Sequence, residues 1–348
     1  MTPAARKPVK SPKRRYILLL AAVLLVASGW SVAWVYGRSV LAGQLDRQLI
    51  RMAEVGLEVS CADLAIRGYP FRYEISCPDM RSRDGSGTAA SLGGLNAVAL
   101  VYNPWHVIFE VKAPAVVTVP MTGVSGEITW ETARASLKFR QSALGALDGV
   151  VQKPEAAFEN AVSAGLFSAE KAEVHLREAP DLPGALDGYV SIDALKLKSL
   201  PDLEDTLDLR GSIRVAGGTA LLAGADLAAL VRMNGEDLPV GLDLFEASLG
   251  RSSVAASGEM LVHGDGTLSG TVELTLGNAT ALLQALKPLF PPKDQTFALL
   301  EGIIGSLEPA QGVDGVASIT LPVKIDRGVA SVGFLPLGRI PALFQAGM

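Results

Sequence analysis

The chain has 348 residues, of which 49% are hydrophobic and 19% are charged. This composition excludes a wholly disordered chain, because disordered sequences are rich in charge and poor in apolar residues. The net charge is −5, but the first 37 residues contain six Lys or Arg and no acid. The rest of the chain is therefore acidic, and aromatic residues make up only 6% of the whole. Both features disfavour binding to nucleic acid, and we expect no nucleic-acid partner.

Residues 17–36 contain no charged side chain. A helix of this length spans about 30 Å, the thickness of the hydrocarbon core of a bilayer. The basic run before it predicts that residues 1–16 are a cytoplasmic tail and that the body lies beyond the inner membrane. Trp30, Trp34 and Tyr36 lie at the far end, where such rings favour the membrane interface. The alternative is a signal peptide cleaved near residues 31–33, and either reading exports residues 38–348.

Residues 37–55 are predicted to form a helical stalk, because Leu41, Leu45, Leu49 and Met52 recur at helical spacing. The two cysteines, Cys61 and Cys77, follow it. A hairpin centred on Tyr69 would place them opposite each other, with a β-bulge where the alternation of apolar residues breaks. Outside the inner membrane such a pair is oxidised, so we expect a disulfide bond.

The remainder of the chain reads mainly as strands. Between residues 133 and 178 the pattern changes, and Pro154–Leu166 is predicted to be a short helix. The second half predicts an antiparallel meander with short Gly/Asp turns, made of Leu207–Val215, Ala220–Val231, Gly241–Leu249, Ser253–Val262 and Leu268–Leu276.

The clearest alternation in the meander is that of Val272, Leu274 and Leu276 with polar neighbours. These three residues are predicted to point to the covered or concave side of a curved sheet and are the candidate apolar site. Periodicity alone leaves open whether that side is a solid core or a groove for an apolar ligand. Two helices, capped by Asn278 and Asp294, and two strands, Ala317–Ile325 and Gly328–Leu335, are expected to follow.

Motifs for catalysis, metal binding and cofactor binding are missing from the sequence. It contains no Walker lysine, no Gly-x-Ser-x-Gly and no His-Glu-x-x-His. His106, His175 and His263 are far apart and none has a second ligand type at helical spacing. The acidic cluster Asp202, Glu204, Asp205 and Asp208 lacks the glycine and the terminal Glu of a calcium loop. We therefore expect no catalytic residue, no metal and no cofactor.

Several turn and strand motifs carry a resemblance to a known family. Residues Arg67-Gly68-Tyr69-Pro70-Phe71-Arg72 with Cys77, then Val101-Tyr102-Asn103-Pro104, resemble the alphaproteobacterial domain of unknown function 2125. The closing segments 321–325 and 333–337 look like its C-terminal end. The stretch Val254–Leu289 is also similar to the C-terminal module of AsmA-like envelope proteins. That similarity implies an inner-membrane anchor, a periplasmic body and a lipid-related role, and it supplies no catalytic residues.

Together these patterns predict a β-rich α+β fold, in which an N-terminal transmembrane helix precedes curved antiparallel sheets with a few packed helices. The expected order is a basic tail (1–16), the transmembrane helix (17–36), the stalk (37–55), a first β-rich part (56–180), a second, AsmA-like part (181–341) and a tail (342–348). The expected function is non-enzymatic binding of lipid or another apolar ligand in envelope maintenance. The alternatives are an adaptor for another envelope protein and an uncharacterised hydrolase.

Overall fold

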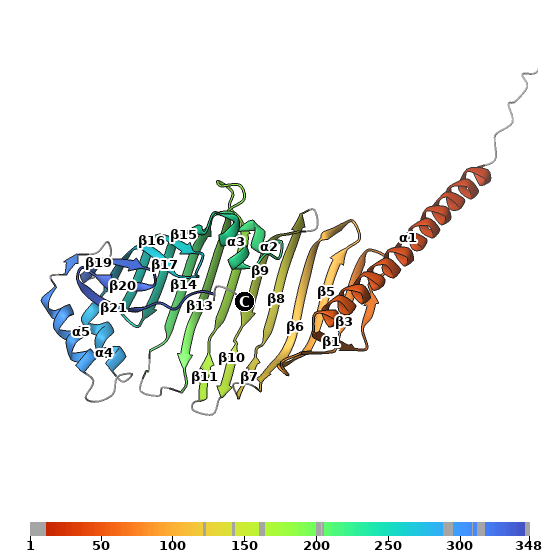
Figure 1. The fold of residues 1–348 in the computed structure, drawn as a ribbon. Coiled ribbons are helices and arrows are strands. Elements are labelled where there is room, and N and C mark those ends of the chain that lie inside the picture. The colour runs from red at the N-terminus through yellow and green to blue at the C-terminus, as the bar shows by residue number, and fades with distance from the viewer. Residues whose placement is uncertain are drawn as a thin grey trace, which may run out of the picture.

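The structure is a computed structural model that describes residues 12–120, 123–140, 143–159, 164–199, 203, 205–287, 295–307, 309–311 and 317–344. Figure 1 shows a long sheet that runs from an N-terminal helix to a pair of helices near the far end. The described part is rich in strand, with a large antiparallel sheet and a small number of helices. The predicted β-rich α+β fold class is therefore confirmed.

Helix α1 extends without interruption from Pro12 to Glu54. Its 43 residues correspond to a length of about 65 Å. The predicted membrane segment and the predicted stalk are thus one helix. The part from Lys13 to Glu54 is long and apolar enough to cross a membrane, by its length and composition. The apolar side chains from Ile17 to Val26 are exposed.

The strands pair into one 21-stranded sheet within the described residues. In chain order the strands are β1 (Leu57–Ala62), β2 (Ala65–Arg67), β3 (Arg72–Cys77), β4 (Asp79–Asp84), β5 (Ala89–Leu100), β6 (Asn103–Val119), β7 (Val124–Thr129), β8 (Thr132–Arg140), β9 (Ala143–Gln152), β10 (Glu155–Glu159), β11 (Ala164–Ser168), β12 (Lys171–Glu178), β13 (Leu186–Leu197), β14 (Leu207–Val215), β15 (Asp237–Leu249), β16 (Ser252–His263), β17 (Leu268–Gly277), β18 (Ala310–Gln311), β19 (Ala317–Asp326), β20 (Val329–Val332) and β21 (Leu335–Arg339).

The long strands β5 and β6 set the layout of the first half. Strands β3 and β4 pair with the two halves of β5, while β8 and β7 pair with the two halves of β6. Two rows of shorter strands follow, β7–β10–β11 and β8–β9–β12, and they meet again at β13. From β13 the sheet continues through β14, β15, β16 and β17 to β19 and β20. All these pairings are antiparallel.

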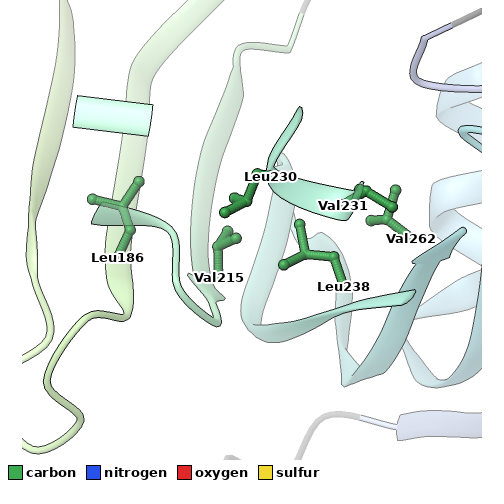
Figure 2. Close-up of a cluster of buried hydrophobic side chains, with 6 residues drawn as sticks. All are labelled: Leu186, Val215, Leu230, Val231, Leu238 and Val262. Atoms are coloured by element: carbon green, nitrogen blue, oxygen red, sulfur yellow. The ribbon is translucent and has the colours of Figure 1, made fainter. Parts of the chain in front are cut away.

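Short helices cover only parts of the sheet. They are α2 (Thr219–Leu222), α3 (Leu227–Met233), α4 (Ala279–Leu286) and α5 (Gln295–Ser306). Helix α3 packs Leu230 and Val231 against Leu238 and Val262 of the sheet, and all four side chains are almost completely buried (Figure 2). Burying each such side chain contributes about 1.5–3 kcal/mol, so this cluster is a local core.

Three predicted elements differ from the structure. Pro154–Leu166 is not a helix, because Glu155–Glu159 pairs as a strand between β7 and β11. Ala220–Val231 is not a strand but contains α2 and α3, and Asp226 caps α3 by accepting a hydrogen bond from the amide of Ala229. Helix α4 follows Asn278 as predicted, yet the Asn278 side chain makes no capping hydrogen bond. The predicted cap Asp294 lies outside the described residues.

Candidate functional site

One face of the sheet carries an unbroken band of apolar side chains. Because residues directly opposite each other in a sheet point to the same face, the pairing register places three side chains from each strand in line with three from the next. We call this band the apolar lane. Along the sheet it consists of Tyr73, Ile75 and Cys77 (β3); Ala99, Ala97 and Leu95 (β5); Val107, Phe109 and Val111 (β6); Leu137, Ala135 and Ala133 (β8); Leu147, Gly149 and Val151 (β9); Leu176, Val174 and Ala172 (β12); Gly188, Val190 and Ile192 (β13); Ile213, Gly211 and Leu209 (β14); Leu242, Phe245 and Ala247 (β15); Gly258, Ala256 and Val254 (β16); Val272, Leu274 and Leu276 (β17); and Val323, Leu321 and Ile319 (β19).

The lane is long and contains no charged side chain. With neighbouring strands about 4.8 Å apart, it extends over about 50 Å from β3 to β19. Its only hydroxyl belongs to Tyr73, at the end next to α1. Strand β5 keeps the band continuous despite a register shift at Gly94, beyond which Ala90 and Leu92 continue the same face. A lane of this length and composition offers a surface for an elongated apolar molecule.

The middle of the lane is open to solvent. Val174, Val190, Ile213 and Phe245 are 38%, 49%, 41% and 39% exposed, and they lie on the neighbouring strands β12 to β15. The described part of the chain places α2 and α3 only beside this region, over the cluster that Leu186 and Val215 join. Large apolar side chains gathered on one exposed face mark a binding surface more often than scattered ones do.

The apolar face widens near β6. There Met80 (β4), Leu92 (β5), Ala115 and Val117 (β6) and Ile128 (β7) line a small cavity of about 240 Å³. Phe158 and Phe167 extend the same face along β10 and β11, with their ring centroids 6.4 Å apart. The lane is therefore broadest in the half of the sheet that lies closer to α1.

The opposite face of the same strands is mostly polar. Its ion pairs include Lys171–Glu173 (3.1 Å), Arg214–Asp187 (2.7 Å) and His175–Asp148 (2.9 Å). The hydrogen bond from Lys171 to Glu173 raises the pKa of the Lys171 ammonium. In the same way, the hydrogen bond from the Arg214 guanidinium to Asp187 raises the pKa of Arg214. This segregation of polar and apolar side chains leaves the lane as the sole apolar face of β12 and β13.

Helix α1 packs against the first end of the lane. The Trp34 ring stacks on Tyr73 with centroids 5.5 Å apart and meets Tyr69 edge to face. Its indole N–H donates to the Arg72 carbonyl at 3.1 Å, and the Tyr73 hydroxyl donates to the Trp34 carbonyl at 3.3 Å. Trp34 is only 8% exposed. Trp34 therefore fixes the helix to the β2–β3 hairpin.

The far end of the lane is covered by the C-terminal strands. Val272 is buried with Val323 and Ile325, and Leu274 packs against this cluster. Ile340, beyond β21, packs there as well. The predicted candidates Val272, Leu274 and Leu276 thus lie together on one face, at the covered end of the lane. The open positions such as Val190 and Phe245 were not singled out from the sequence, because their alignment depends on the register of many strands.

Cys61 and Cys77 form the predicted disulfide bond, with their Cα atoms 5.8 Å apart. The predicted hairpin geometry is wrong, however. Cys61 lies on β1 opposite Met80, whereas Cys77 ends β3. The structure has two successive strands, β1 and β2, in place of the single bulged strand. The extended conformation is interrupted between them at Asp63, whose φ is +55°. The bond therefore ties β1, which pairs with β4, to the end of β3.

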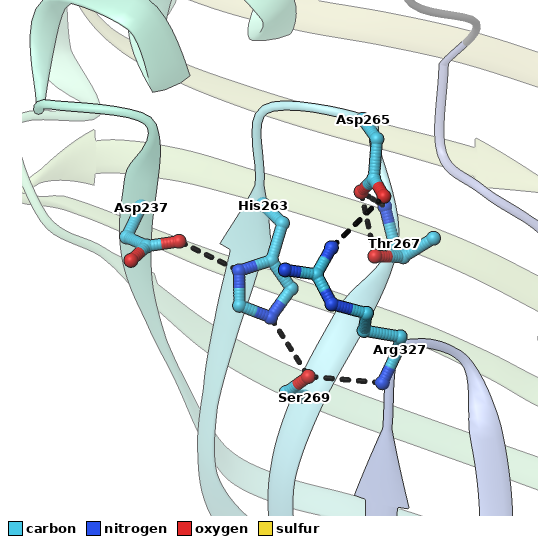
Figure 3. Close-up of polar contacts among 6 residues, drawn as sticks. All are labelled: Asp237, His263, Asp265, Thr267, Ser269 and Arg327. Carbon is cyan, nitrogen blue, oxygen red and sulfur yellow. Dashed lines mark hydrogen bonds and ion pairs between the residues drawn. The ribbon is translucent and has the colours of Figure 1, made fainter.

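A polar cluster joins the ends of β15, β16 and β17 (Figure 3). His263 contacts Asp237 through Nδ1 at 2.6 Å and Ser269 Oγ through Nε2 at 2.7 Å. These contacts have the order of a Ser–His–Asp triad. Ser269 differs from such a nucleophile in two respects, since it lies within a paired strand and its Oγ accepts the backbone N–H of Arg327 at 3.0 Å. The sequence could not reveal the cluster, because only the strand register brings these residues together.

Metal-binding groups of three or more acidic, His or Cys side chains are absent from the described residues. Of the acidic cluster considered from the sequence, Asp202 and Glu204 lie outside the described residues. Asp208 accepts a hydrogen bond from the amide of Ala194 at 2.7 Å. His106 contacts Ser136 Oγ at 2.8 Å. Each of these contacts is a local link within the sheet.

A protein-family model matches most of the chain. The model of a family described as an uncharacterized protein conserved in bacteria (DUF2125) matches residues 34–341. The match includes Trp34, the disulfide and the whole apolar lane. No curated protein matches the chain. The chain belongs to the DUF2125 family of uncharacterized bacterial proteins.

Proposed function

We propose that this protein is a non-catalytic, lipid-binding protein anchored in the inner membrane, and that the apolar lane holds acyl chains or a similar apolar ligand. The observation that carries the proposal is the continuity of the lane, which stays free of charge from β3 to β19 and is open in its middle. Water contact with such a surface is unfavourable by about 25 cal/mol for each Å². A bound acyl chain would remove that contact.

The position of the helix supports a membrane source for the ligand. The lane begins at Tyr73, which stacks on Trp34 of α1, and Trp34 lies near the end of the uncharged segment 17–36. A lipid that leaves the outer leaflet beside α1 would therefore meet the first strands of the lane.

Charge and cysteine chemistry support the proposed compartment. The six basic residues before the uncharged segment favour a cytoplasmic N-terminus, and a disulfide between Cys61 and Cys77 favours an oxidising compartment for the body. We propose a periplasmic body in envelope maintenance. A reporter fused after Met348 that works only in the cytoplasm should be inactive, and its activity would overturn this topology.

Two neighbouring residues on β15 provide a matched test of the lane. Phe245 lies on the lane and is 39% exposed, whereas Leu244 faces Ser212 on the other side of the sheet and is 37% exposed. Replacing either by Gln changes a similarly exposed apolar side chain into a polar one. Only Phe245→Gln places an amide against the ligand, which costs about 1–3 kcal/mol. We expect roughly a tenfold loss of bound lipid for Phe245→Gln and little change for Leu244→Gln.

The measurement is native mass spectrometry of the full chain purified in detergent, with lipid analysis of the same sample. Near-ultraviolet circular dichroism should show that both variants remain folded. Equal lipid content in Phe245→Gln, Leu244→Gln and the unchanged protein would contradict lipid binding on the lane. A polypeptide that co-purifies in place of lipid would support the adaptor alternative.

The contacts of His263 keep hydrolase activity as a second candidate. A nucleophilic Ser269 would react with a fluorophosphonate, because such probes modify serines activated by a neighbouring base. We expect no labelling beyond that of the Ser269→Ala variant, since the Oγ is held by His263 and Arg327. Labelling that disappears in Ser269→Ala would instead establish the hydrolase.

A further inference from the structure

Exposed aromatic side chains gather at one corner of the sheet. Phe71, Tyr102 and Trp105 are 63%, 73% and 58% exposed, and we call them the aromatic tip. Phe71 lies in the β2–β3 turn, Tyr102 lies in the turn between β5 and β6, and Trp105 lies near the start of β6. Rings of this size are seldom left in water without a reason, because each exposes a large apolar area.

The two turns form a single corner. The amide of Val101 donates to the Phe71 carbonyl at 3.0 Å, and Arg72 lies opposite Leu100 in the β3–β5 pairing. The three rings of the aromatic tip therefore project from neighbouring segments that are joined by backbone hydrogen bonds.

Contacts with helix α1 fix the position of this corner along the helix axis. The Trp30 indole N–H donates to the Pro70 carbonyl at 2.8 Å, and Ser31 Oγ and the Tyr69 hydroxyl are 2.7 Å apart. One turn further along the helix, Trp34 binds the Arg72 carbonyl. These contacts lie within the uncharged segment 17–36, roughly 3–9 Å before its end at Tyr36.

We infer that the aromatic tip inserts into the interfacial region of the bilayer that α1 crosses, on the side of the body. The inference rests on the proposed anchoring of α1 and adds a second membrane contact to it. If residues 17–36 span the hydrocarbon core, the hairpin that contacts Trp30 and Trp34 lies roughly 3–9 Å inside the edge of that core, next to the headgroups. Aromatic rings partition to that level.

The charges around the corner agree with this placement. Arg67 and Arg72 are exposed on the same hairpin, where they can reach lipid phosphates, which arginine binds in a bidentate manner. Arg72 also contacts Glu74 at 3.1 Å, on the side away from the turn. With α1 and two turns in contact with the bilayer, the body has a fixed orientation, and the lane begins at the membrane surface.

Fluorescent labelling at single cysteines tests the inference on the full chain. The two native cysteines are bonded to each other, so a new cysteine takes up a nitrobenzoxadiazole label selectively. Tyr102→Cys labels the aromatic tip and Val23→Cys labels the anchor. Gly85→Cys is the matched control, because it lies in the turn at the opposite end of β5, with open space around it. The proteins are reconstituted in vesicles of phosphatidylethanolamine and phosphatidylglycerol that contain nitroxide-labelled phospholipid.

We expect nitroxide lipids to quench most of the fluorescence of the labels at positions 23 and 102 and to leave the label at position 85 unquenched. Quenching at position 23 without quenching at position 102 would overturn the inference but leave the anchor intact. Absence of quenching at position 23 would overturn the anchoring itself. Equal quenching at positions 85 and 102 would also contradict the inference, because the body would then lie along the membrane without a defined tip.

Discussion

Removing the Trp34 side chain should weaken the attachment of the β2–β3 hairpin to α1. The ring is 8% exposed, packs on Tyr69 and Tyr73, and donates a hydrogen bond to the Arg72 carbonyl. Truncation of a buried aromatic residue costs about 3–5 kcal/mol. Because each 1.4 kcal/mol corresponds to a factor of ten, Trp34→Ala should accelerate amide exchange in the hairpin at least roughly 100-fold, provided that those amides exchange through local opening.

Hydrogen exchange with mass spectrometry of the full chain in detergent measures this effect. Trp34→Phe is the matched variant, since it keeps an aromatic ring but loses the N–H bond, which contributes about 0.5–1.5 kcal/mol. Its exchange should rise by roughly tenfold or less. Amides of β13 and β14, far from α1 in Figure 1, serve as the internal reference. Unchanged protection of the hairpin in Trp34→Ala would refute the assignment of Trp34 as a contact that stabilises it.

Two further predictions concern stability. Replacing both Cys61 and Cys77 by Ser should lower the free energy of unfolding by about 3 kcal/mol, because the bond closes a loop with a sequence separation of 16; an unchanged denaturant midpoint would contradict this. The hydrogen bond from the Thr267 hydroxyl holds the pKa of Asp265 below its usual range, so this carboxylate stabilises the fold above pH ~4 and loses its effect as the pH falls through the lowered pKa. Asp265→Asn should therefore lower the melting temperature at pH 7, and this loss should shrink as the pH falls through the lowered pKa. A loss that stays the same throughout acid titration would refute the assignment.

Local patterns in the sequence predict the elements that have a clear residue pattern of their own. The alternation of Val272, Leu274 and Leu276 predicts β17, and the uncharged run predicts α1. The misassigned segment Ala220–Val231 contained a usable signal, since Asp226 precedes apolar residues at helical spacing and Asn234-Gly235 ends the helix. That signal indicates α3, but the continuous apolar residues of Ala220–Val231 favoured the prediction of a strand.

Other features depend on tertiary structure. Glu155–Glu159 forms a strand because β7 and β11 flank it on both sides, which overrides its helical composition. The apolar lane can be recognised only when the register of each successive strand pair is known. A slip of one residue in any strand would turn the side chains of that strand to the other face. The contact of Trp34 with Tyr73 joins residues that are 39 positions apart, and no local pattern indicates it.

The apolar lane explains why periodicity could not separate a core from a groove. The same register runs through Phe245 on β15 and Leu274 on β17, yet their surroundings differ. Leu274 packs against a cluster that Val332 and Ile340 help to cover, whereas Phe245 is 39% exposed. The difference arises from the segment after β19, which folds back over one end of the lane. A polar replacement at Leu274 should therefore unfold the C-terminal part, and one at Phe245 should reduce ligand binding while the fold is kept.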